Sequence, residues 1–115
     1  MRLLCSGMLL LAALCPAVAQ VGVFYNFIEW AQKTSPERVG YIAGAVDSMV
    51  IYAETTDQKS YSVHISGCLR NSGIRTSQLA DNVLNYGNQH PEVQSQPVQV
   101  ALAQYLNVYC SSTHL

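Results

Sequence analysis

Apolar residues recur with a helical period along most of this chain. Their spacing predicts a first helix from Val23 to Lys33 and a second from Pro36 to about Thr56. A third helix is predicted from Ser77 to about Asn88. The last begins at Ser95-Gln96-Pro97 and closes at Cys110, and proline, glycine and capping residues separate the four segments. The pattern is that of a small all-α domain.

The stretch between the second and third predicted helices has a different pattern. Tyr61, Val63 and Ile65 alternate with polar residues, which favours a short strand or an extended segment. The whole connection, Gln58 to Arg75, is long for a small helical domain, and long loops of this kind are usually functional or mobile. We therefore expect a bundle of about four helices with a long, partly extended loop between helices two and three.

The second predicted helix contains two glycines one turn apart, Gly40 and Gly44. Each costs about 1 kcal/mol relative to alanine in a helix. That cost is understandable if another backbone packs against the same face, so we expect this to be the central helix of the core. Asp47 lies one turn later in an otherwise apolar stretch. Its carboxylate is expected either to bond a neighbouring helix end or hydroxyl, or to contact a partner.

The first nineteen residues have the pattern of a signal peptide. Arg2 precedes an apolar run of roughly a dozen residues from Leu3 to Leu14, which is short for a membrane span. Ala17-Val18-Ala19 is a small-x-small cleavage site, so cleavage is expected after Ala19. Residues 20–115 then form a single exported domain. They contain no second long apolar run, so the mature chain is not expected to enter a membrane.

Charge narrows the choice of partner. The mature segment has five basic and seven acidic residues, a net charge of −2, and its basic residues do not cluster. A nucleic-acid partner is therefore not expected.

Cysteines survive signal cleavage at two positions, Cys68 and Cys110. In an oxidising compartment two cysteines of a small domain are expected to pair. A bond between Cys68 and Cys110 would close the loop between them and stabilise the domain by roughly 4 kcal/mol in the chain-entropy description. The alternative is two free thiols, one of them a nucleophile.

Catalytic chemistry has little support in the sequence. Cys68 could be drawn with His64 or His90 as a thiol and base, but no spacing favours this over a disulfide. The histidines are isolated, and metal-ligand spacing, phosphate loops and nucleophile motifs do not appear. We expect a binding or structural protein, not an enzyme, with no catalytic residue, metal or cofactor.

The order of motifs resembles the Rap/Tai family of bacterial immunity proteins, the exported helical partners of type VI secretion effectors. The family pattern runs GYI-x-G-x-x-D, a loop cysteine, a helix ending near His-Pro, and an Ala-Leu-rich last helix closing on a cysteine. The matching residues are Gly40, Tyr41, Gly44 and Asp47, then Cys68, Gln78-Leu79-Ala80-Asp81, His90-Pro91-Glu92, Val100-Ala101-Leu102 and Cys110. The chain departs from the pattern at Val39 and Leu69, where the family often has a cysteine and a proline, and Thr55 to Ile65 is longer than usual.

The resemblance implies a periplasmic homodimer that binds and inhibits a peptidoglycan amidase effector. A protruding element would fill the enzyme cleft, and the connection from Gln58 to Arg75 is the best candidate for it. Its Tyr61, His64 and Arg70 are the expected partner-binding residues, because such side chains are common interface anchors. The alternative is a small periplasmic helical chaperone or stress-response binding protein.

Overall fold

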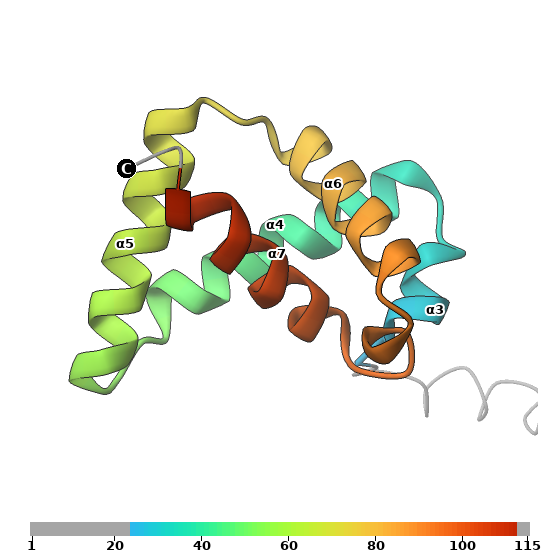
Figure 1. Cartoon of the computed structure of the whole chain (residues 1–115), viewed down its shortest axis with the longest axis horizontal. Helices are drawn as coiled ribbons and strands as arrows, with labels where there is room; N and C mark the ends of the chain where they lie inside the picture. The colour runs from blue at the N-terminus through green and yellow to red at the C-terminus, as the bar shows by residue number, and fades with distance from the viewer. Residues whose placement is uncertain (1–23, 113–115) are drawn as a thin grey trace, which may run out of the picture.

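The computed structural model describes residues 24–112, and the expected signal peptide, Met1 to Ala19, lies outside this range. The described part contains five α-helices and one short 3₁₀ helix (Figure 1). They are α3 (Phe27–Ala31), α4 (Ser35–Ile51), α5 (Thr56–Ser72), α6 (Thr76–Gln89), η1 (Pro91–Val93) and α7 (Val98–Ser112). The all-α prediction is therefore confirmed for this part, with one helix more than expected.

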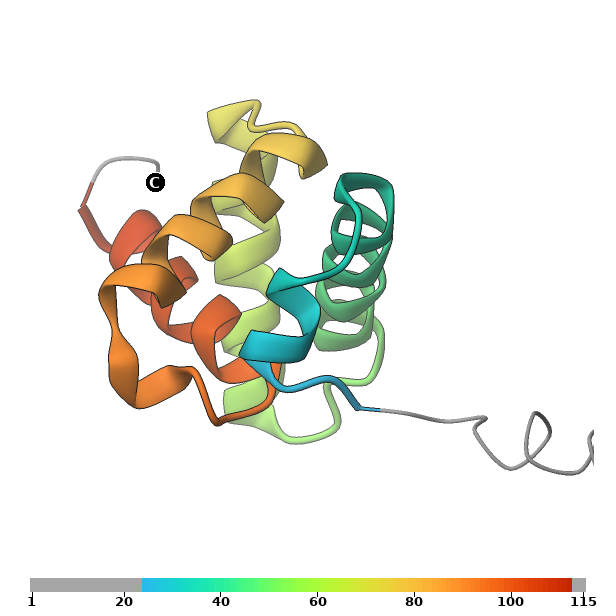
Figure 2. The same cartoon turned by 90° about the vertical axis from the view of Figure 1, so that its right-hand side faces the viewer.

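Helix α7 contributes more buried residues to the described core than any other helix. One face of it is almost fully shielded from solvent, because α3, α5, α6 and η1 all pack against it (Figures 1 and 2). The buried residues on that face are Val98, Ala101, Leu102, Leu106 and Cys110. The clean helical spacing of these positions is what made α7 predictable.

Helix α4 lies at the edge of the bundle and packs on α5 and α6. It begins after Thr34, whose hydroxyl accepts a hydrogen bond from the backbone N–H of Glu37 while the Glu37 carboxylate accepts one from the N–H of Thr34. Ile42 is its one fully buried residue. The expectation that α4 is the central core helix is therefore wrong, since its other apolar residues are half-buried or exposed.

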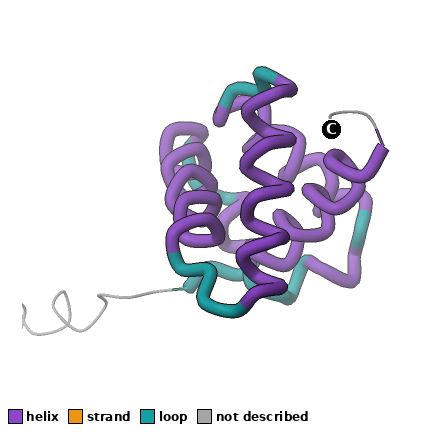
Figure 3. The backbone as a smooth tube through the Cα atoms, turned by 90° about the vertical axis from the view of Figure 1, so that its left-hand side faces the viewer, coloured by secondary structure: helices purple, strands orange, loops and turns teal. Residues whose placement is uncertain are grey.

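The predicted long loop between the second and third helices is a helix, α5, which Figure 3 shows as one continuous coil. Thr55 and Gln58 form a capping box in which each side chain bonds the other's backbone N–H, and this reciprocal pair starts the helix. The residues that α5 buries are Ser62, Ile65 and Cys68, at helical spacing. Val63 is 73% exposed, so the alternation of Tyr61, Val63 and Ile65 that favoured a strand did not report burial.

Cys68 and Cys110 form a disulfide bond, as the sequence predicted, with their Cα atoms 5.7 Å apart. The bond joins α5 to the end of α7, and both cysteines are buried in the core. The alternative of two free thiols is therefore wrong.

Candidate protein-binding site

The α4–α5 corner comprises the last turn of α4, residues 52–55 and the first two turns of α5. Its backbone is fixed at both ends: the N–H of Tyr52 donates to Ser48 O at 3.1 Å, and Gln58 Oε1 accepts from the N–H groups of Glu54 and Thr55 at 3.0 and 3.1 Å. In Figure 1 the corner lies at one end of the bundle, at the lower left. A short connection held in this way presents its side chains in a defined arrangement.

Large apolar side chains of the corner face solvent, that of Val50 in part. Ile51 is 69% exposed and Tyr52 is 74% exposed. Exposed apolar groups that lie together, rather than scattered singly, commonly mark an interaction surface. The corner therefore has an apolar surface that the domain's own packing does not use.

A notch of about 220 Å³ opens beside Tyr52. Met49, Tyr52, Ala53 and Tyr61 supply its apolar and aromatic walls. Tyrosine and methionine are enriched in protein interfaces. A notch of this size accommodates one apolar side chain of a partner.

Tyr61 forms the α5 wall of this notch and is held in place by its hydroxyl. The hydroxyl donates a hydrogen bond to Asn107 Oδ1 at 3.2 Å, across to α7. Burial raises the pKa of the Tyr61 phenol, because desolvation disfavours the charged phenolate. The ring is thus a neutral, positioned surface at ordinary pH.

The other two predicted partner-binding residues lie elsewhere on α5. His64 is exposed and borders a shallow hollow on the outer face of the helix together with Lys59 and Val63. Arg70 is exposed further along α5, where its guanidinium donates to Ser66 Oγ at 3.4 Å. The structure therefore does not gather Tyr61, His64 and Arg70 into one loop tip.

Met49 and Tyr52 were not predicted as binding residues from the sequence. The pattern that could have indicated them is a pair of apolar residues at the end of the helical stripe of α4.

The glycines of the family-like motif are not packed against another backbone. Gly40 and Gly44 are exposed, and a Cβ built on either would meet nothing within 4 Å apart from its chain neighbours and the backbone of its own helix. The prediction that another backbone packs closely against these glycines is therefore wrong. Tyr41 does connect elements: its ring lies 5.6 Å from that of Tyr25, and its hydroxyl accepts a hydrogen bond from Gln99 Nε2 at 3.0 Å.

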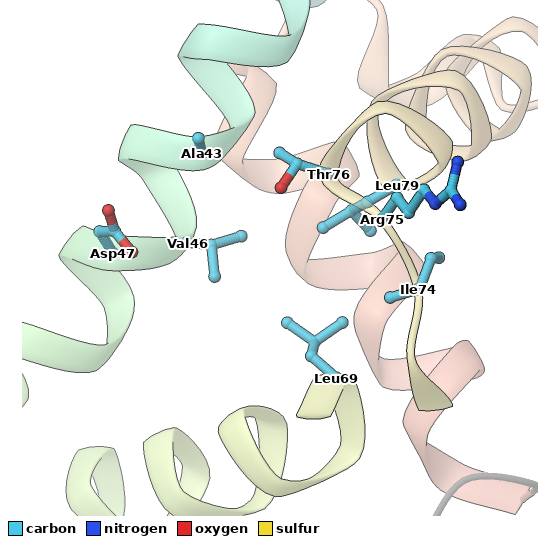
Figure 4. A pocket seen from close by; sticks show the side chains of 8 residues that line it. All are labelled: Ala43, Val46, Asp47, Leu69, Ile74, Arg75, Thr76 and Leu79. Carbon is cyan, nitrogen blue, oxygen red and sulfur yellow. The ribbon is translucent and has the colours of Figure 1, made fainter. Parts of the chain in front are cut away.

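Asp47 lies at the edge of a groove of about 320 Å³ lined by residues of α4, α5, α6 and the α5–α6 connection (Figure 4). Val46, Leu69 and Ile74 point into this groove. Asp47 itself is exposed and makes no hydrogen bond or ion pair with any described residue. The expectation that its carboxylate bonds a neighbouring helix end or hydroxyl is wrong for the described part, and the partner-contact alternative stays a prediction.

The titratable side chains of residues 24–112 do not assemble into a metal site, since no three of His, Cys, Asp and Glu come together there. Cys68 is bonded to Cys110 and cannot serve as a thiol nucleophile. None of the described helices combines the length and hydropathy that crossing a membrane requires.

Comparison with known proteins adds no relative. No protein-family model matches the chain, and no curated protein or solved structure matches it significantly. The likeness to immunity proteins therefore depends on the motif residues given above.

Proposed function

We propose that this protein is a periplasmic immunity protein that binds a peptidoglycan amidase effector of type VI secretion and blocks its active-site cleft. The order of motifs from Gly40 to Cys110 supports the family assignment. The observation that carries the proposal is the exposure of Ile51 and Tyr52 beside an aromatic notch at one end of the bundle. This corner takes the role that the sequence assigned to a long loop.

A protein inhibitor needs a firm element that displaces water from the enzyme cleft. Tyr52 supplies a large side chain with few rotatable bonds, and the capped turn at Thr55 limits the backbone movement behind it. The notch formed with Tyr61 receives an apolar side chain from the rim of the cleft. His64 and Arg70 lie elsewhere on α5, and a contact of either with the amidase is a separate prediction.

The experiment mixes the mature protein with a candidate amidase encoded beside its gene and measures peptidoglycan hydrolysis. The wild type should inhibit, and a variant carrying Ile51→Ser and Tyr52→Ala should bind at least about thirtyfold more weakly, as expected for interface hot spots. The matched control is Ile28→Ser on α3, which removes an apolar side chain that is 47% exposed at the other end of the bundle. This control should inhibit as the wild type does.

Two results would contradict the proposal. If the wild type leaves the amidase active, the function is wrong. If the corner variant inhibits as strongly as the wild type, the corner is not the binding surface.

A chaperone remains the second candidate, since exposed apolar groups such as Tyr52 and Val63 also suit an unfolded client. The two functions differ in stoichiometry and selectivity. An inhibitor forms a saturable complex with one folded enzyme, whereas a chaperone suppresses the aggregation of unrelated proteins.

The homodimer implied by the family resemblance is part of the proposal, and sedimentation of the mature protein tests it.

A further inference from the structure

A hollow of about 530 Å³ lies where the α5–α6 connection meets α6 and the end of α7. It is separate from the α4–α5 corner and has a different chemistry, because polar side chains contribute much of its lining. The residues that matter are Gln78, Asp81 and Asn82 from α6 and Tyr109 from α7. Its volume lies within the range of about 300–1,000 Å³ that is usual for small-molecule sites.

Two amide side chains of this hollow each have one hydrogen-bonding group in use and one without a described partner, whereas the Ser72 hydroxyl bonds Leu69 O and the N–H of Ile74. Gln78 Oε1 accepts from the N–H of Arg75 at 3.0 Å, which leaves the Gln78 NH₂ group without a described partner. Asn82 Nδ2 donates to the hydroxyl of Tyr105 at 2.8 Å, which leaves the Asn82 carbonyl oxygen available as an acceptor. Asp81 is exposed and bonds no described residue. The hollow thus combines an amide donor with amide and carboxylate acceptors.

Tyr109 provides the aromatic part of the lining, and Ile74 is its aliphatic part. The Tyr109 ring stacks on Tyr105 with the centroids 5.6 Å apart and the planes inclined by 22°. Tyr105 is in turn held by the bond from Asn82. The aromatic surface is therefore fixed relative to the polar groups of α6.

We propose that this hollow binds a neutral, hydroxyl-rich ligand, namely a pyranose ring of an oligosaccharide. Each sugar hydroxyl both donates and accepts, which matches the mixed set from Gln78, Asp81 and Asn82. The C–H face of the ring packs against the carbon surface of Tyr109.

Charged ligands fit the hollow less well. It has no cationic side chain in its lining to hold an anion, and Asp81 would repel one. One carboxylate is also too few for a calcium ion, which takes six to eight oxygen ligands. The sugar site is independent of the amidase inhibition proposed above.

The test uses two soluble trisaccharides, tri-N-acetylchitotriose and maltotriose, titrated into the oxidised mature protein and followed by NMR. We expect saturable binding of at least one, with shift changes at the backbone amides around Gln78 to Asn82 and Tyr109. Asp81→Ala should weaken that binding by at least about tenfold, since it removes a charged acceptor. The matched control is Asp57→Ala, because Asp57 is an exposed acid of α5 outside the hollow.

Tyr109→Leu provides a second variant that keeps an apolar side chain and loses the ring, and it should also weaken binding. Circular dichroism of each variant checks that the helices are retained. The proposal is wrong if neither trisaccharide binds. It is also wrong if the Asp81 and Tyr109 variants bind as tightly as the wild type, or if the shift changes are centred on the α4–α5 corner.

Discussion

The ring of Phe27 occupies the space that any side chain at position 87 would need. A Cβ built on Gly87 would overlap ring atoms Cε2, Cζ and Cδ2 of Phe27. Both residues are buried, and the ring also packs against Trp30, with centroids 5.7 Å apart. Among the glycines that the structure describes, Gly87 is therefore the one at which close packing matters, because Phe27 of α3 packs against α6 there.

Alanine in place of the tightly packed Gly87 and alanine in place of the exposed Gly44 should have different effects on stability. Gly87→Ala should lower the free energy of unfolding by about 1–3 kcal/mol, as overpacking of a core usually does. Gly44→Ala should leave it unchanged or raise it by up to about 1 kcal/mol, because alanine is the better helix former and the site is open. Urea unfolding of both variants measures this, and a destabilised Gly44→Ala would show that α4 has a close neighbour after all.

Three of the five described helices could be predicted from the sequence, although α4 ends at Ile51 and not at about Thr56. In α4, α6 and α7 the apolar period coincides with the face that is buried, and prolines or capping residues mark the ends. Helix α5 was missed because Val63 lies on its exposed side, so a period-two pattern appeared by coincidence. The sequence did contain a contrary signal: Thr55 and Gln58 have capping-box spacing, and Ser62, Ile65 and Cys68 follow at helical intervals.

The candidate site was harder to predict than the helices. Tyr61 was named from the sequence, but its partners Met49 and Tyr52 come from the end of a different helix. Their proximity depends on how α4 turns into α5, which local patterns do not determine. At Gly40 and Gly44 the sequence misled in the other direction. Glycine is unfavourable inside a helix, and this cost was interpreted as a sign of close packing, although both positions face solvent.

Removing the disulfide should destabilise the domain strongly. The cysteines are 42 residues apart in sequence, and a loop of that length corresponds to about 4 kcal/mol in the chain-entropy description. A variant with Cys68→Ala and Cys110→Ala should therefore unfold at much lower urea, and reduced wild type should behave like it. Amides of α5 should exchange faster in the variant, because the bond ties this helix to α7. A loss of less than about 1 kcal/mol would contradict the prediction.

Glu37 should make the stability depend on acidic pH. Its pKa is lowered from the ordinary value of 4.5, mainly by the backbone N–H of Thr34 and also by the Thr34 hydroxyl. Because the folded pKa lies below the unfolded one, the stabilisation is present above the unfolded pKa and is lost as the pH falls through the folded pKa.

The comparison for this prediction is Glu37→Gln, which keeps an acceptor for the Thr34 N–H and removes the charge. Wild type should lose more thermal stability than this variant between about pH 6 and about pH 3. Equal losses would show that the capping carboxylate is not the titrating group. An NMR titration of the Glu37 side chain gives its folded pKa directly.

Tyr61 should make the stability depend on alkaline pH. Burial raises the pKa of its phenol above the ordinary value of 10.0, so the folded state holds the proton more tightly than the unfolded state does. This stabilisation is therefore fully present below the unfolded pKa and is lost as the pH rises through the folded pKa.

Tyr61→Phe should lower the free energy of unfolding by about 0.5–1 kcal/mol near neutral pH, since it removes the hydrogen bond to Asn107. The same variant should lose less stability than wild type between about pH 8 and about pH 11. Part of the alkaline loss should persist in the variant, because burial also raises the pKa of Tyr105. Thermal unfolding at the two pH values measures the difference, and an unchanged alkaline loss in Tyr61→Phe would show that the ring beside the notch is open to water.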